Sequence, residues 1–274
     1  MVNGLLLVDK PAGWTSHDVV AKVRNILRQE ILLASHVDAV QASQEERVSR
    51  RSATVSERQT SADTAMRQKP AGVSGSAGQQ GKAVRRLKVG HTGTLDPFAT
   101  GLLMLVIGSY TKRAGEFSKL DKTYEAELTL GSTSTTGDPE GKITSVSGEV
   151  PTENQIKNAI AQFIGNIEQT PHQYSAVKVG GQRAYKLARE GKTPQLEPRK
   201  VTIYEIRIAK YEYPKLCITA RVSSGTYIRS LAEDIGAKLG TGAYLSALRR
   251  AYVGKYSVED AQDLQNIGIS AIIR

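Results

Sequence analysis

The sequence predicts an α+β fold in which helices flank a mixed β-sheet. Segments with the two-residue alternation of strands and segments with the spacing of amphipathic helices both occur along the 274 residues. They follow one another without the regular strand–helix period of a parallel α/β protein. Hydrophobic residues make up 39% and charged residues 23%, as in a soluble globular protein. We expect a single domain over residues 1–274.

The first helix is expected over residues 16–28. Ser16 can cap its N-terminus through the side-chain hydroxyl. The apolar residues of its one hydrophobic face are Val19, Val20, Val23, Ile26 and Leu27.

The stretch 34–84 differs from the rest of the chain in composition. Residues 41–84 contain no Leu, Ile or aromatic residue, and Ser, Gln, Ala, Gly and Arg dominate. Such a sequence cannot bury enough apolar surface to offset the entropy lost on ordering. We therefore interpret 34–84 as a low-complexity insertion, disordered or weakly helical, that interrupts the domain. A solvated spacer is its ordinary role, and non-specific RNA contact through its arginines is the alternative.

Strand and helix signals continue after the insertion. In residues 124–130 every second residue, beginning with Tyr124, points to the same face, as in a half-buried strand. Thr152 and Gln155 form a capping-box pattern that predicts a helix, and Gly165 can end that helix.

A second strand–helix pair lies near the C-terminal end. Residues 216–222 alternate like a strand. Apolar residues then recur at helical spacing from Ile228 to Leu239, and Gly240 stops this helix.

Several functional classes are excluded by the sequence. The nearest phosphate-loop patterns, GTGAYL and GSAGQQGK, lack a required glycine, and the second also lacks the magnesium-binding Ser or Thr. The four histidines are scattered and Cys217 is the only cysteine, so we expect no metal site and no internal disulfide. No stretch reaches the roughly 18 apolar residues of a membrane span. We expect a cytoplasmic protein that does not bind a membrane.

A net charge of +10 favours a polyanionic partner such as nucleic acid. The insertion contributes little to this charge, because it holds seven basic and five acidic residues. The basic character therefore belongs to the folded part of the chain. Candidate phosphate contacts are Lys10, Lys88, Lys178, Arg183, Arg199, Lys200, Arg249 and Arg250, and each could equally be a solvated surface charge.

Asp96 is the first candidate catalytic residue. It lies in GHTGTLDP, where glycines and an Asp-Pro pair predict a tight loop just before the apolar run 102–107. A carboxylate held rigidly on such a loop can be a nucleophile, a general base or a turn cap. Tyr124, which begins a strand, and Arg229, which begins a helix, are weaker candidates. Taken alone they suggest a core aromatic and a surface pair with Glu233.

Four motifs together change this interpretation. They are GLLLVDKPAGWTSHDVV (4–20), KVGHTGTLDPFATGLL (88–103), QTPHQYSAVKVGGQRAYKLAR (169–189) and SSGTYIR (223–229). In this order they closely resemble the bacterial tRNA pseudouridine-55 synthase family, the TruB type. The resemblance runs from Gly4 to about Ala261 apart from the insertion, and it implies the pseudouridine synthase fold with an RNA-binding cleft.

The resemblance also implies roles for individual residues. Asp96 matches the catalytic aspartate, and Arg229 matches the arginine that pairs with it. Tyr124 matches the tyrosine that stacks on the target uracil and helps to move a proton. Further matched positions are His91, which fills the space left by the flipped base, Tyr227 and Leu248, which line the pocket, and residues 174–199, a mobile segment that closes on the RNA arm.

The implied activity is isomerisation of uridine 55 in the tRNA T-loop to pseudouridine, without cofactor or metal. The enzyme is expected to act as a monomer that binds the T-arm of tRNA and needs no protein partner. Asp96 could attack the base or the sugar, or act as a base. A related synthase acting on another RNA, and an RNA-binding or tRNA-folding chaperone without catalysis, are the alternatives.

Three departures from the family pattern are visible. The insertion replaces a short link, and His172 stands where a second proline is common. The chain stops too soon after Ala261 for the small C-terminal RNA-binding domain, the PUA domain, of many relatives, so we expect none.

Overall fold

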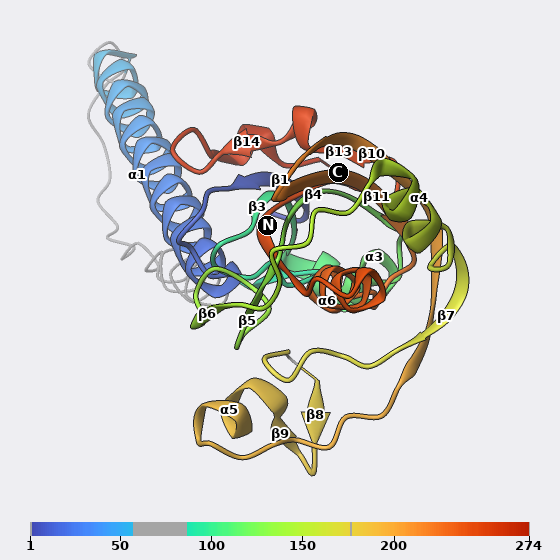
Figure 1. Ribbon diagram of the computed structural model, residues 1–274. Coiled ribbons are helices and arrows are strands. Elements are labelled where there is room, and N and C mark those ends of the chain that lie inside the picture. Colours follow the sequence, from blue (N-terminus) through green and yellow to red (C-terminus); the bar gives the residue numbers. More distant parts are fainter. Residues whose placement is uncertain (1, 57–86, 176, 274) are drawn as a thin grey trace.

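The computed structural model describes residues 2–56, 87–175 and 177–273, and a mixed β-sheet forms its centre (Figure 1). Along the sheet the strand order is β14-β1-β3-β12-β4-β11-β10-β7, with β2 paired to β3 and β13 to β12. Most neighbours are antiparallel, whereas β1–β14 and β12–β3 are parallel. The mixed sheet expected from the sequence is therefore confirmed.

The strands of this sheet are β1 (Gly4–Lys10), β2 (Val89–His91), β3 (Thr100–Ile107), β4 (Lys122–Leu130), β7 (Gly165–Gln169), β10 (Arg199–Glu212), β11 (Lys215–Val222), β12 (Ala243–Val253), β13 (Tyr256–Ser257) and β14 (Gln262–Asp263). Two small hairpins add β5 (Ser132–Ser134) with β6 (Ile143–Ser145), and β8 (Lys178–Val179) with β9 (Gln182–Arg183). The α-helices are α1 (Ser16–Ser56), α3 (Ala114–Ser118), α4 (Glu153–Ala161), α5 (Ala184–Arg189) and α6 (Ile228–Leu239). Short 3-10 helices are η2 (Gly108–Arg113), η3 (Val258–Asp260) and η4 (Ile269–Ala271).

The apolar run after the Asp96 loop forms β3, which is buried on both faces of the sheet. Its odd residues Leu103, Leu105 and Ile107 join the main core with α1, α4 and α6. Its even residues belong to a smaller core on the other face, namely Leu102, Met104 and Val106. A strand covered on both sides reads as a continuous apolar run, which explains the sequence after the loop. The same alternation buries Tyr124 and its partners along β4, as expected.

The first helix differs from its expected form at both ends. Thr15 is its cap: the Thr15 hydroxyl accepts a hydrogen bond from Asp18 N at 3.1 Å, and the Asp18 carboxylate accepts one from Thr15 N at 3.0 Å. The Ser16 hydroxyl instead contacts the backbone of Leu95. The helix ends at Ser56 rather than Arg28, because no glycine or proline occurs in residues 14–69 to stop it.

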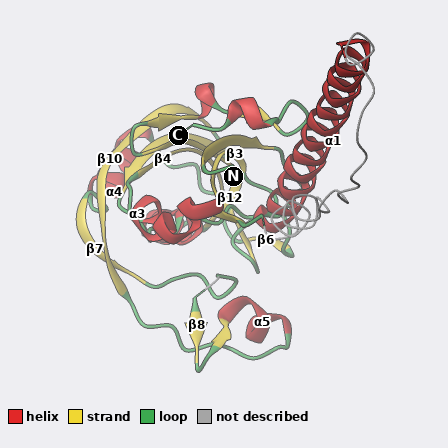
Figure 2. Ribbon diagram, turned by 180° about the vertical axis from the view of Figure 1, so that it is seen from behind, coloured by secondary structure: helices red, strands yellow, loops and turns green. Residues whose placement is uncertain are grey.

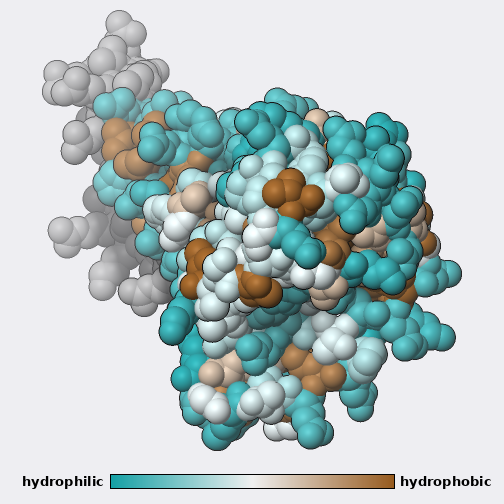
Figure 3. Space-filling view, viewed as in Figure 1, coloured by the Kyte–Doolittle hydropathy of each residue, from teal (hydrophilic) through white to brown (hydrophobic). Residues whose placement is uncertain are grey.

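Beyond its base, α1 projects away from the sheet, so the beginning of the insertion is helical (Figure 1). Hydrophobic side chains lie exposed there, including Leu33 at 68% (Figure 3). Residues 57–84 of the expected insertion lie outside the described residues.

The expected capping box of α4 is confirmed at Thr152 and Gln155. Gly165 does not end this helix, which stops at Ala161; it begins β7 with a φ of +108°. The expected stop of α6 is confirmed, because Gly240 adopts the left-handed conformation with a φ of +74°.

Residues 174–199 form a protruding segment that holds β8, β9 and α5. It leaves the sheet after β7 and returns through β10, and both ribbon views show it apart from the sheet (Figures 1 and 2). Within the described ranges, no helix has the length and apolarity needed to cross a membrane.

Candidate active site

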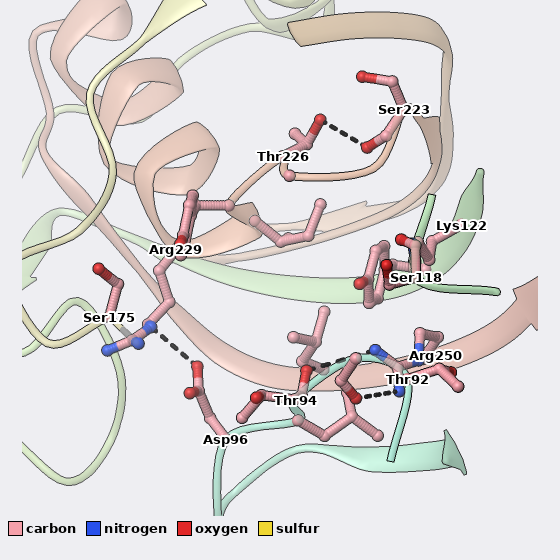
Figure 4. A pocket seen from close by; sticks show the side chains of 17 residues that line it. Thr92, Thr94, Asp96, Ser118, Lys122, Ser175, Ser223, Thr226, Arg229 and Arg250 are labelled. Carbon is pink, nitrogen blue, oxygen red and sulfur yellow. Dashed lines mark hydrogen bonds and ion pairs between the residues drawn. The ribbon is translucent and has the colours of Figure 1, made fainter. Parts of the chain in front are cut away.

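The Asp96 loop joins β2 to β3, and two buried cations hold its backbone in place. Lys10 Nζ donates to Pro97 O at 3.1 Å, and also to the carbonyls of Pro11 and Trp14. The Arg250 guanidinium donates to Gly93 O at 3.1 Å, Thr94 O at 3.3 Å and Leu102 O at 2.7 Å (Figure 4). These charge-assisted bonds occupy carbonyls that a tight loop would otherwise leave unpaired.

Lys10 and Arg250 were expected as candidates for RNA phosphate contacts or as solvated surface charges. The structure shows that both are buried instead. Their side chains are 0% and 2% exposed, so neither can reach a phosphate on the surface. Burial lowers the pKa of Lys10 to about 8, and the nearby Arg250 charge acts in the same direction.

A third anchor fixes the residue just before Asp96. The Ser16 hydroxyl accepts a hydrogen bond from Leu95 N at 2.9 Å and donates one to Leu95 O at 3.0 Å. Together with Lys10 and Arg250, it leaves the backbone at Asp96 little freedom. These contacts agree with the expected tight loop, and the role of Asp96 on it stays a prediction.

The Asp96 carboxylate points to Arg229 at the start of α6. Arg229 Nε lies 3.0 Å from Asp96 Oδ2 (Figure 4). The Arg229 side chain is 5% exposed, whereas that of Asp96 is 31% exposed, so one partner is buried and the other reaches the cavity. The surface pair between Arg229 and Glu233 is therefore wrong, since Glu233 instead lies 3.5 Å from His172.

Arg229 is held by contacts on every side of its guanidinium. Nη1 lies 3.0 Å from Asp138 Oδ2 and donates to Thr136 O at 3.0 Å, while Nη2 donates to Tyr174 O at 3.1 Å. The guanidinium thus connects two carboxylates and the root of the protruding segment. Only a planar group with several donors can make this set of contacts.

The electrostatic environment of Asp96 has opposing parts. Burial raises the pKa of Asp96, the Arg229 guanidinium opposes the rise, and the Asp138 carboxylate adds to it. Such a competition is typical of functional carboxylates, whose desolvation increases their reactivity while a cation keeps them ionised.

A cavity of about 300 Å³ opens beside this pair (Figure 4). Its lining includes Asp96, Tyr124, Tyr227, Arg229 and Leu248, which come from the loop, β4, the α6 terminus and β12. The volume is at the lower end of the range for small-molecule sites. The structure therefore brings together five of the six residues expected from the sequence.

His91, the sixth residue, lines a neighbouring cavity of about 680 Å³ that shares Asp96 and Arg229 with the first. Its ring meets the His17 ring edge-on, with centroids 5.7 Å apart. Burial lowers the pKa of His91, with smaller effects from His17 and Arg250. Its Nδ1 atom is buried and has no hydrogen-bond partner within the described part of the chain. The lining of this cavity also includes Lys178, Arg183 and Arg189 of the protruding segment.

Sequence reasoning missed Asp138 and Lys122 at this site, and it named His172 only as a departure from the family pattern. Asp138 follows Gly137, whose left-handed φ of +68° turns the chain toward Arg229, and the Thr-Thr-Gly-Asp-Pro sequence was the available signal. Burial lowers the pKa of Lys122, a cavity-lining residue, to about 8. Among the described residues, no group of three or more His, Cys, Asp or Glu could hold a metal ion.

Two protein-family models together match residues 81–271 of the chain. The model described as the N-terminal domain of TruB family pseudouridylate synthase matches residues 81–228. The model described as the tRNA pseudouridylate synthase B C-terminal domain matches residues 229–271. The boundary between the two matches falls between Ile228 and Arg229.

Curated relatives cover the chain almost completely. A protein of Thermobifida fusca named tRNA pseudouridine synthase B is 37% identical over 97% of this chain and 75% of its own length. The protein of the same name from Cupriavidus metallidurans is 44% identical over 98% of this chain and 68% of its own length.

Solved structures share the fold. A chain of a Cbf5-Nop10-Gar1 complex superposes with a TM-score of 0.57 at 24% identity, covering 97% of this chain and 54% of that one. A chain of an H/ACA RNP bound to a substrate RNA containing 2′-deoxyuridine gives a TM-score of 0.55 at 23% identity, with 97% and 52% covered. This chain thus spans about half the length of these solved chains, and the likeness confirms the α+β fold.

Proposed function

Because the chain belongs to the TruB family of pseudouridylate synthases, we propose that it isomerises uridine 55 in the T-loop of tRNA to pseudouridine, with Asp96 as the catalytic carboxylate. The family resemblance drawn from four sequence motifs is confirmed by these relatives. The observation that carries the proposal is the Asp96–Arg229 pair at the wall of the 300 Å³ cavity.

The reaction explains why an ionised, oriented carboxylate is needed. Pseudouridine formation breaks the N1–C1′ bond of uridine, turns the uracil, and joins C5 to C1′, while the C5 proton is lost and N1 gains one. Atoms and electrons balance within the nucleoside, so the step needs no cofactor. The Asp96 carboxylate can attack as a nucleophile or remove a proton. In either role Arg229 favours the ionised form, opposing the rise in pKa that burial gives Asp96, and fixes its direction.

The target base must leave its stack to reach Asp96, which costs a few kcal/mol. Tyr124 and Tyr227 line the cavity from two different elements and offer aromatic faces to a flipped uracil. Stacking on one aromatic ring is worth roughly 1–3 kcal/mol per base, so it can offset a large part of this cost. Leu248 closes the apolar part of the lining.

The larger cavity beside His91 is the proposed site for the RNA strand around the flipped base. Its lining includes Lys178, Arg183 and Arg189, which can pair with backbone phosphates. His91 lines this cavity, and its match to the family residue supports the proposal that it fills the space that the base leaves. We propose that the protruding segment closes on the T-arm, and that the protein acts in the cytoplasm as a monomer.

The test is conversion of a tRNA transcript followed by mapping of pseudouridine at single-nucleotide resolution. We expect one pseudouridine, at position 55, and none in a transcript carrying cytidine there. A T-arm hairpin should suffice as substrate if the T-arm is the recognised element. Binding without any pseudouridine would instead support the chaperone alternative. Mapping of cellular RNA with and without the protein would reveal a different target, which would contradict the tRNA assignment.

A further inference from the structure

His172 lies beside Arg229, in the turn between β7 and the protruding segment. Its side chain is only 7% exposed. The site geometry described above assigns no role to this histidine, yet the imidazole is placed between Arg229 and the root of the segment.

The contacts of His172 define which nitrogen carries the proton. Tyr174 N donates a hydrogen bond to His172 Nδ1 at 3.2 Å, and Arg229 Nη1 lies 3.5 Å from the same atom. Both groups are donors, so Nδ1 must carry a free lone pair. The ring proton is therefore on Nε2, which faces Glu233 Oε1 at 3.5 Å.

Arg229 and His172 both form hydrogen bonds with the backbone of Tyr174. His172 Nδ1 accepts from the N–H of Tyr174, and Arg229 Nη2 donates to the Tyr174 carbonyl at 3.1 Å. The Tyr174 ring also stacks on the His172 ring, with centroids 5.8 Å apart and an angle of 26° between the planes. Tyr174 is at once the first residue of the protruding segment and part of the lining of the larger cavity.

The charged groups around the imidazole would respond to its protonation. Arg229 and Glu233 face it from α6, Asp138 lies beyond Arg229 on the loop after β5, and Asp96 is within its electrostatic reach. A proton on Nδ1 would remove the acceptor for Tyr174 and place a second positive charge beside the Arg229 guanidinium. Glu233 would be the only carboxylate directly facing the new charge among these contacts.

We propose that neutral His172 is a positioning residue that links Arg229, and through it Asp96, to the root of the protruding segment, and that protonation of His172 breaks this link. The inference rests on the proposed function, because the linked segment is the part that would close on RNA. It makes closure and the orientation of the catalytic pair one coupled event, which a proton on His172 Nδ1 would disrupt.

Three variants separate the parts of this proposal. His172→Ala removes the acceptor, whereas His172→Asn keeps a carbonyl oxygen that can accept from Tyr174 N but cannot titrate. His36→Ala changes an exposed histidine on α1 and serves as the matched control. Single-turnover conversion of a tRNA transcript, measured from pH 5 to 8, reports the effect on Arg229 and Asp96.

At pH 7.5 we expect His172→Ala to lower the single-turnover rate constant about tenfold, because a small misplacement of catalytic groups is costly. His172→Asn should keep a rate near that of the wild type at pH 7.5 and lose less of it on acidification. His36→Ala should match the wild type throughout. A wild-type rate for His172→Ala, or a wild-type pH profile for His172→Asn, would overturn the proposal.

Hydrogen exchange of the protein without RNA gives an independent readout. We expect the amides of residues 173–190 to lose protection in His172→Ala and to keep it in His172→Asn, after correction for intrinsic exchange. Unchanged protection in His172→Ala would overturn the link to the segment. If the wild type forms no pseudouridine, the proposed function fails, but this exchange experiment still decides whether His172 holds the segment.

Discussion

Arg229 Nε lies 3.0 Å from Asp96 Oδ2, and this contact joins a buried guanidinium to a carboxylate that reaches the cavity. The same guanidinium contacts Asp138 and two backbone carbonyls. Its position is therefore fixed from several directions before any substrate arrives, as electrostatic preorganisation requires.

Replacing Arg229 with lysine should abolish most of the activity. A single ammonium cannot contact Asp96, Asp138 and the Tyr174 carbonyl together, so we expect the single-turnover rate constant to fall about 100-fold or more. Arg207→Lys is the matched control, because Arg207 is exposed and pairs with Glu205 on the surface. Equal rates for the two variants at saturating RNA would show that Arg229 is not needed to orient Asp96.

Replacing Tyr124 with phenylalanine separates stacking from proton movement. The ring that lines the cavity is retained, so RNA affinity should stay within about twofold of the wild type. If the hydroxyl helps to move a proton, the single-turnover rate constant should fall about 100-fold. Filter binding and tritium release from C5 measure the two quantities. A wild-type rate would limit Tyr124 to stacking.

Lys10 gives a prediction for the pH dependence of stability. Its pKa is lowered by burial to about 8 in the folded protein, against 10.5 for an unperturbed lysine. Between these values the unfolded chain binds a proton that the folded chain does not, so stability rises with pH. Relative to Lys10→Met, the free energy of unfolding should rise by about 3 kcal/mol from pH 8 to 10.5. Parallel pH profiles in urea would contradict a buried, desolvated Lys10.

Removing residues 34–84 should leave the core folded and active. Among the α1 side chains that the structure describes, the buried ones all precede the deletion: Ser16, Val19, Val20, Val23 and Leu27. A Gly/Ser linker of about eight residues spans roughly 16 Å, comparable to the helix length between Arg24, which contacts Val89, and Leu33. Thermal unfolding and single-turnover conversion are the measurements. A large drop in melting temperature, or loss of conversion, would show that the deleted region is structural or functional.

Local patterns predicted the elements that depend on neighbours in sequence. The alternation after Tyr124, the capping box at Thr152 and the glycine stop at Gly240 all appear in the structure. The Asp96 loop could be predicted as rigid because its glycines and Asp-Pro pair restrict the backbone locally. The motif order added Arg229 as the partner of Asp96.

The remaining features depend on contacts between distant residues, which leave little trace in a single sequence. Lys10 and Arg250 look like surface cations, but each is buried against carbonyls of the Asp96 loop. Asp138, on the loop after β5, pairs with Arg229 at the start of α6 across 91 residues of sequence. The part of α1 after Arg28 was not predicted because its amphipathicity is weak. The signal that it continues is the absence of glycine and proline from residues 14–69.

Replacing Asp96 with asparagine tests the central claim most directly. Asparagine keeps the shape of the side chain but carries no charge, so it cannot act as a nucleophile or a base at this position. The measurement is single-turnover pseudouridine formation at position 55 of a tRNA transcript, with melting temperature and RNA affinity determined on the same preparation. We predict no detectable product, with folding and RNA binding retained. Product formation near the wild-type rate would contradict the assignment of Asp96 as the catalytic carboxylate.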